Sequence, residues 1–152
     1  MRVLGLLLCG GALGLAAPAM AAETIRPGQW ETRTAISHVS MPGAPPGPAV
    51  MMKGKPHTSR HCVTPEQAAA GPKELFAKSE GQCQFTRFNM AGGKIDTVMQ
   101  CKQRQGDTMN GVTKGSYTPT TYTTNTRLEM TGQRGKMVML SSGTGKWLGP
   151  CK

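Results

Sequence analysis

The sequence predicts a mainly β domain: a single antiparallel sheet, curved or partly closed into a barrel, with one short helix and a long loop rich in Pro, Gly and Met. Three observations support this prediction. Several segments alternate apolar and polar residues with the period of two that is typical of half-buried strands. One segment combines the start and stop signals of a helix. An even number of cysteines follows a leader segment, and low aromatic content with frequent glycine favours crosslinks as a supplement to burial.

The first residues have the pattern of a secretory signal peptide. Arg2 supplies a positive start, and the apolar run over residues 3–17 is shorter than the roughly 20 residues of a membrane-spanning helix. Ala19 and Ala21 place small side chains at a cleavage site, whereas Cys9 lacks the small preceding residue that lipidation requires. Residues 1–21 are therefore expected to be removed, which leaves one disulfide-stapled β domain over residues 22–152.

A strand and a long loop are expected to open the mature chain. Residues 30–36 alternate apolar and polar side chains, and Gly28 marks the start of this segment. The stretch from Ser40 to Pro56 contains five prolines, which cannot donate backbone hydrogen bonds, so it predicts an exposed, flexible loop. A possible binding surface on and beside this loop consists of Met41, Met51, Met52, Lys53, Lys55 and His57.

A second extended segment leads into the one convincing helix. Thr64 is a suitable N-cap, Pro65 fits the first helical position, and Gln67 completes a capping box. The Gly-Pro pair at 71–72 ends the helix, and a second short turn is expected over residues 73–78. A β meander should follow, with strands over residues 82–90, 94–103, 110–117, 121–130, 136–142 and 145–148.

The turn at Gly92 and Gly93 sets the register of a hairpin. With these two residues at its tip, Phe88 faces Thr97, and one apolar face is shared by Phe88, Met90, Ile95, Met99 and Cys101. Cys83 then points to the opposite face from Cys101 unless a bulge intervenes.

Four cysteines are expected to form two disulfides: Cys62, Cys83, Cys101 and Cys151. The hairpin register favours pairing Cys62 with Cys83 and Cys101 with Cys151. Pairing of Cys62 with Cys151 stays open, because spacing does not exclude it.

The order of several short motifs resembles a known family. Pro27-Gly28-Gln29-Trp30-Glu31 opens the mature chain, Cys62-Val63-Thr64-Pro65-Glu66 follows the loop, and Gly149-Pro150-Cys151 closes it. With Cys83 and Cys101 between them, these motifs resemble domain-of-unknown-function family 3617 (DUF3617), a family of small exported bacterial proteins. The resemblance covers the mature chain and implies an extracytoplasmic, β-rich domain. It implies no activity and no catalytic residues.

The sequence offers little material for catalysis. It contains no G-x-S-x-G, H-E-x-x-H or phosphate-cradling glycine loop. Gly143, Gly145 and Lys146 resemble a phosphate loop in composition alone, and such signals are usually turns. We therefore expect no enzyme, no catalytic residues and no cofactor.

Copper binding is one alternative function, because thioether and imidazole ligands suit Cu(I). Met41, Met51 and Met52 precede His57 and His61 in the sequence. The two histidines are four residues apart in an extended stretch, where they do not converge on one ion. The simpler interpretation is that the later methionines fill the core and the loop methionines form an adaptable apolar surface. No metal ligands are therefore assigned.

Net charge suggests a second alternative function, that of an envelope-associated protein that binds anionic surfaces. Without Arg2 the chain has 17 basic and 8 acidic side chains, a net charge of +9. Such a charge attracts anionic surfaces, which in the periplasm are lipid headgroups or acidic polymers. Aromatic residues do not alternate with the basic ones, so nucleic acid is not an expected partner. We expect a periplasmic, non-enzymatic binding or accessory protein that acts on an unknown small ligand or envelope protein and is not transmembrane.

The exported protein should begin at Ala22 or Glu23, because cleavage follows the small side chains at Ala19 and Ala21. Intact-mass measurement of the protein recovered from the periplasm checks this start. A mass that still includes residues 1–21, or a lipid on Cys9, would contradict the expected processing.

Overall fold

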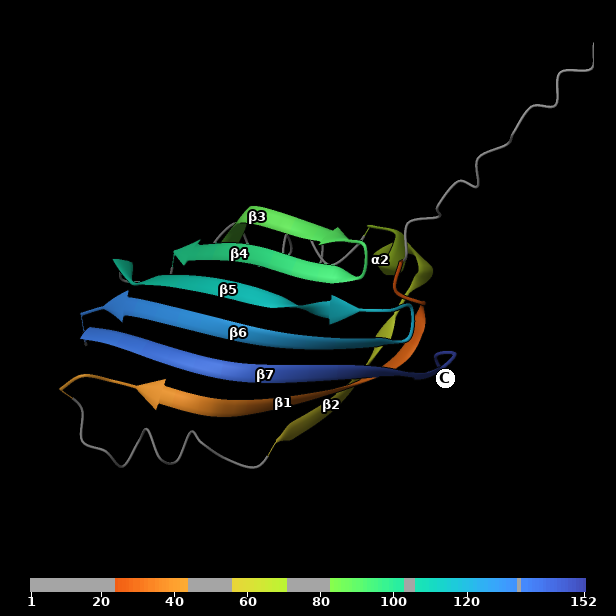
Figure 1. Cartoon of the computed structure of the whole chain (residues 1–152), viewed down its shortest axis with the longest axis horizontal. Helices are drawn as coiled ribbons and strands as arrows, with labels where there is room; N and C mark the ends of the chain where they lie inside the picture. Colours follow the sequence, from red (N-terminus) through yellow and green to blue (C-terminus); the bar gives the residue numbers. More distant parts are fainter. Residues whose placement is uncertain (1–23, 44–55, 71–82, 103–105, 134) are drawn as a thin grey trace, which may run out of the picture.

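The computed structural model describes residues 24–43, 56–70, 83–102, 106–133 and 135–152 (Figure 1). Within these residues the chain forms seven strands and one short helix. The strands are β1 (Gly28–Ser40), β2 (His57–Val63), β3 (Cys83–Ala91), β4 (Lys94–Lys102), β5 (Thr108–Tyr117), β6 (Thr121–Gly132) and β7 (Gly135–Gly149), and the helix is α2 (Pro65–Ala70).

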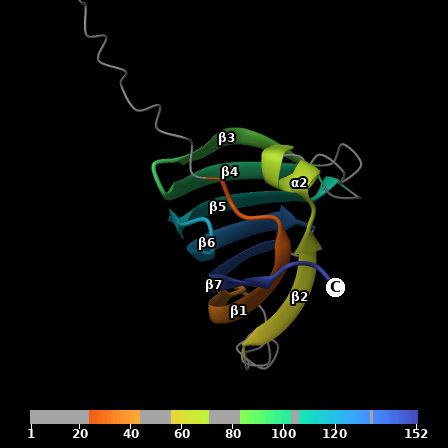
Figure 2. The same cartoon turned by 90° about the vertical axis from the view of Figure 1, so that its right-hand side faces the viewer.

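The strands form one antiparallel sheet in the order β2-β1-β7-β6-β5-β4-β3. Strands β3 to β7 are a meander, and β7 then pairs with β1, which pairs with β2 at the edge. The edge strands β2 and β3 are not paired with each other among the described residues, so the sheet does not close into a barrel. Figure 2 shows β2 running along one side of the sheet and leading into α2.

Helix α2 begins with the predicted capping box. The backbone N–H of Gln67 donates to Thr64 Oγ1 at 3.2 Å, and the backbone N–H of Thr64 donates to Gln67 Oε1 at 3.0 Å. Two of the otherwise unsatisfied donors at this helix start are thereby bonded. Ala68 is buried on the side of α2 that packs against Trp30 and Val63. The part of the chain that the structure describes contains no helix that is long and apolar enough to cross a membrane.

The predicted strands are present, with one correction. The segments 136–142 and 145–148 were expected to be separate strands, but they form the single 15-residue strand β7. Gly143 and Gly145 stay in the ladder, opposite Thr124 and Tyr122 of β6, so their interpretation as turn residues was wrong. Residues 44–55 of the predicted loop and the predicted turn over residues 73–78 lie outside the described residues.

The β3–β4 hairpin has the predicted register near its turn, with Phe88 opposite Thr97. The register shifts by one residue between Phe85 and Arg87. A shift of one residue exchanges the two faces of a strand, so Cys83 comes to lie directly opposite Cys101. This one-residue shift is the β-bulge that a Cys83–Cys101 disulfide requires, and the sequence disfavoured that disulfide because it does not reveal the bulge.

The favoured disulfide pairing was therefore wrong. Cys83 is bonded to Cys101, and Cys62 is bonded to Cys151. The second bridge follows from the strand order, because Gln29 of β1 pairs with Cys62 on one side and with Gly149 on the other. The start of β1 thus holds the end of β2 beside the end of β7, and the Cα atoms of Cys62 and Cys151 are 5.7 Å apart.

Replacing both Cys62 and Cys151 by serine should destabilise the fold more than replacing both Cys83 and Cys101. The bridges join residues 89 and 18 positions apart, which in the chain-entropy model corresponds to about 4.6 and about 3.2 kcal/mol. Urea unfolding of the two double variants measures the difference. Equal losses, or a non-reduced peptide that joins Cys62 to Cys83, would contradict this arrangement.

Candidate functional site

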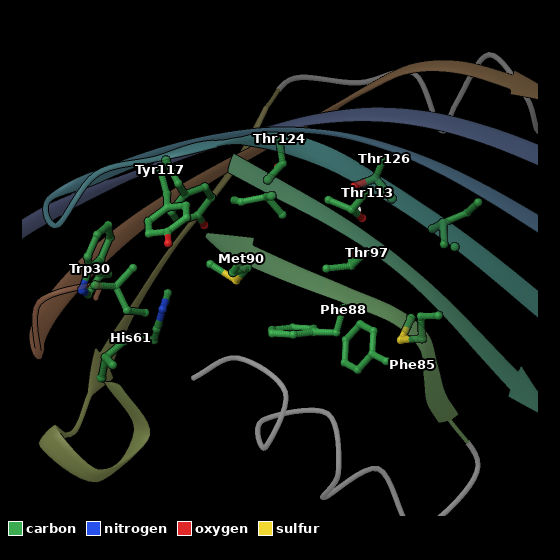
Figure 3. A pocket seen from close by; sticks show the side chains of 17 residues that line it. Trp30, His61, Phe85, Phe88, Met90, Thr97, Thr113, Tyr117, Thr124 and Thr126 are labelled. Carbon is green, nitrogen blue, oxygen red and sulfur yellow. Dashed lines mark hydrogen bonds between the residues drawn. The ribbon is translucent and has the colours of Figure 1, made fainter. Parts of the chain in front are cut away.

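One face of the sheet, which we call the inner face, carries most of the large apolar side chains. Alternate residues of each strand point to it, as Tyr122, Thr124, Thr126 and Leu128 of β6 do. Side chains from both edge strands meet over this face around a cavity of about 320 Å³, which we call the hollow (Figure 3). The hollow is lined by Ile25, Trp30, His61, Val63, Phe85, Phe88, Met90, Ile95, Thr97, Met99, Gly111, Thr113, Tyr117, Tyr122, Thr124, Thr126 and Leu128.

One end of the hollow, the Trp30 end, is densely packed. Trp30 is 2% exposed and clusters with Val63 and Ala68. Its ring stacks on Tyr122 at a centroid distance of 6.0 Å, and its Nε1 donates to the carbonyl oxygen of Arg26 at 2.9 Å. The indole thus has both the apolar neighbours and the hydrogen-bond partner that a buried tryptophan requires.

The opening motif of the mature chain has a physical role at this end. Gly28 has φ +138°, and a Cβ there would overlap Trp147 and the carbonyl oxygen of Gly149. Trp147 Nε1 donates to the carbonyl oxygen of Pro27 at 3.0 Å. Gly28 is therefore needed where β1 passes under Trp147, and Trp30, two residues later, is buried in the core.

The opposite end, the Leu128 end, is loosely packed. Phe85 lies opposite Met99, which lies opposite Gly111, which in turn lies opposite Leu128. The rings of Phe85 and Phe88 meet edge to face at 5.2 Å. These apolar side chains are only half-buried in the described part of the chain.

Four of the hydroxyl groups that line the hollow have hydrogen-bond partners. Thr113 and Thr126 share a hydrogen bond of 2.9 Å, and the Tyr122 hydroxyl shares one of 2.7 Å with Thr32. Thr124 Oγ1 donates to the carbonyl oxygen of Gly143 at 3.4 Å. These polar atoms are therefore satisfied before any ligand arrives.

His61 is the histidine that faces the hollow. It lies opposite Trp30 on the edge strand β2, it is exposed, and Figure 3 shows its imidazole directed toward the lining side chains. His57 lies four residues earlier on the same strand, about 13 Å away at the usual strand rise. Among the described residues, no three His, Cys, Asp or Glu side chains are grouped so that they could hold a metal ion.

The binding surface that the sequence suggested is described only in part. Met41 follows β1 and His57 begins β2, and neither lines the hollow. Met51, Met52, Lys53 and Lys55 lie outside the described residues, so the structure does not test this surface. Met90 and Met99, two of the later methionines expected to fill the core, are half-buried on the inner face and line the hollow.

Several charged groups outside the lining of the hollow form ion pairs. Arg60 pairs with Glu31 at 2.8 Å and Arg87 with Asp96 at 2.9 Å. Hydrogen bonds from Arg127, and then from Lys136, lower the pKa of Glu129. A hydrogen bond from the Thr64 side chain lowers the pKa of Glu66. The stabilisation from both carboxylates is present above their ordinary pKa and is lost as the pH falls through the lowered value.

These features define a small, single-sheet β domain with two disulfides and an apolar hollow on one face. The chain belongs to the family described as Protein of unknown function (DUF3617), whose model matches residues 25–151. This match confirms the resemblance that the motifs indicated. No curated protein and no solved structure matches the chain.

The sequence did not predict the hollow as a site, because its lining can be identified only when the order of all seven strands in the sheet is known. Its signal was nevertheless present in β5 and β6, where small residues alternate on the inner face. Thr113, Thr124 and Thr126 occupy positions at which a closely packed sheet would carry larger apolar side chains.

Gly145→Ala should destabilise the fold by about 1–3 kcal/mol, because its Cβ would overlap the ring of Tyr122 at the Trp30 end. Thr144→Ala is the control, since Thr144 is exposed on the other face of β7 and should change stability by about 0.5 kcal/mol or less. Chemical denaturation measures both variants. Equal stability of Gly145→Ala and the unmodified protein would contradict the close contact.

Proposed function

We propose that this chain is an exported, periplasmic, non-enzymatic binding protein, and that the hollow holds a small apolar ligand against a curved sheet. One observation carries the proposal: apolar side chains from both edge strands, the buried Val63 of β2 and the half-buried Phe85, Phe88 and Met90 of β3, converge on one cavity. Its volume of about 320 Å³ is at the lower end of the range of small-molecule pockets, roughly 300–1,000 Å³.

The lining residues support binding more than catalysis. Those that the structure describes comprise apolar, hydroxyl and glycine residues with one imidazole, and they include no Asp, Glu, Lys, Arg or Cys. Acid–base or nucleophilic catalysis needs a second group to activate or orient the first. A single exposed histidine beside satisfied hydroxyls is a poor basis for such a site.

The disulfides support the proposed compartment. Both bridges, Cys62–Cys151 and Cys83–Cys101, link strands of the sheet. Structural disulfides persist in oxidising compartments such as the periplasm. The signal-peptide pattern of residues 1–21 agrees with export.

An environment-sensitive apolar probe, N-phenyl-1-naphthylamine, should bind the mature protein and gain fluorescence, because the hollow excludes water from it. Thr124→Lys should weaken this binding at least about tenfold by placing a charge among the lining side chains. Thr123→Lys is the matched control, because Thr123 is the neighbouring residue on the opposite, exposed face of β6.

Circular dichroism of both variants verifies that they are folded. Equal probe binding by the two lysine variants would place the probe outside the hollow. Failure of the unmodified protein to bind the probe would contradict the proposed function itself.

A further inference from the structure

The lining of the hollow extends along the strands. On β6 it runs from Tyr122 to Leu128, six residues along one strand, which corresponds to about 20 Å. An extended hydrocarbon chain that lies along the strands can therefore contact apolar lining side chains over this whole length.

The chemistry along the hollow also suits a hydrocarbon. The hydroxyls of Thr113 and Thr126 bond to each other, and that of Tyr122 bonds to Thr32. A polar ligand would have to displace these bonds, whereas an apolar chain leaves them intact. The body of the ligand therefore gains most from burying hydrocarbon against Phe88, Ile95 and Leu128.

An imidazole and a guanidinium lie at the Trp30 end of the hollow. His61 faces the hollow at the Trp30 end. Arg26 follows the lining residue Ile25, and its guanidinium lies 4.5 Å from the ring centroid of Trp147, which packs against Trp30. Arg26 has no carboxylate partner among the described residues. The described lining includes no Asp or Glu, so an anionic group at this end meets two potential donors.

We propose that the ligand is a single-chain amphiphile with a carboxylate head. The hydrocarbon chain lies in the hollow along the strands, and the carboxylate accepts hydrogen bonds from His61 and Arg26 at the Trp30 end. This inference rests on the proposed function, because it names the ligand class of the same hollow.

Displacement of N-phenyl-1-naphthylamine by straight-chain carboxylates of increasing length tests the chain. Affinity should rise about fourfold with each added methylene while the chain is being buried. It should stop rising once the chain exceeds the length of the hollow, about 20 Å. A compact apolar competitor such as adamantane should displace the probe less well than a chain of equal carbon number.

Gly111→Val shortens the hollow at its Leu128 end. A Cβ at Gly111 would lie 3.0 Å from Leu128 Cδ2 and 3.8 Å from Met99 Cε, which are both flexible side-chain ends, so the variant can fold. Its affinity should stop rising at a shorter chain length, while short chains bind as before. Val112→Leu, one residue along β5 and on the opposite face, should leave the length dependence unchanged.

Comparing each carboxylate with the alcohol of the same length tests the head. The carboxylate should bind about tenfold more tightly at low ionic strength, as expected of charge-assisted hydrogen bonds. His61→Gln and Arg26→Gln should each reduce this preference and leave alcohol binding unchanged. His57→Gln, on the same strand and outside the lining, should keep the preference.

Two failures are distinguishable. If the probe binds in the hollow but chain length has no effect, or the alcohol binds as tightly as the carboxylate, the ligand class is wrong and the proposed function stands. If neither the probe nor any amphiphile binds, the proposed function fails and this inference fails with it.

Discussion

Burial of the Trp30 indole is the constraint on which this structure depends. The ring reaches its position because Gly28 lets the backbone pass beneath Trp147, and because the carbonyl oxygen of Arg26 accepts its N–H. Packing of Val63 and Ala68 against the ring then fixes the end of β2 and the start of α2. The same junction holds Cys62 beside Cys151, so the covalent link and the apolar cluster stabilise one end of the sheet together. Strands β2 and β7, which flank β1, are thereby joined to β1 by backbone hydrogen bonds and by packing of their side chains in the Trp30 cluster.

Away from this junction the described residues give the sheet little to pack against. A sheet with one apolar face normally buries it beneath a second layer of helices or strands. Here α2 has six residues, and its buried side chain Ala68 lies at the Trp30 end. The lining of the Leu128 end therefore stays half-buried, although it includes the rings of Phe85 and Phe88. Among the described residues, the packing over this face is concentrated at the Trp30 end.

Local sequence signals predicted much of this fold, because the relevant forces are local. Period-two alternation identified the strands, the Thr64 capping box identified the helix, and the Gly92–Gly93 turn set the hairpin register. The disulfide pairing was missed, because a one-residue shift beside Thr86 exchanges the faces of β3 and leaves no clear sequence signal. The hollow was missed because its lining combines residues as distant as Trp30 and Leu128, which meet through strand order alone. The loop residues favoured as a binding surface, such as Met51, drew attention for their composition, which says nothing about where they lie in the sheet.

The composition of the inner face explains why the hollow persists instead of collapsing. Gly143 and Gly145 of β7 leave room for Thr124 and Tyr122 of β6, so these side chains lie down across the neighbouring strand. The Thr124 hydroxyl donates to the Gly143 carbonyl oxygen, and the Tyr122 hydroxyl shares a hydrogen bond with Thr32. Filling the space with larger side chains would break these bonds and leave polar atoms buried without partners, at about 1–3 kcal/mol each. The described residues therefore keep half-buried hydrocarbon beside hydrogen-bonded hydroxyl groups, and the proposed ligand would gain free energy by covering this hydrocarbon.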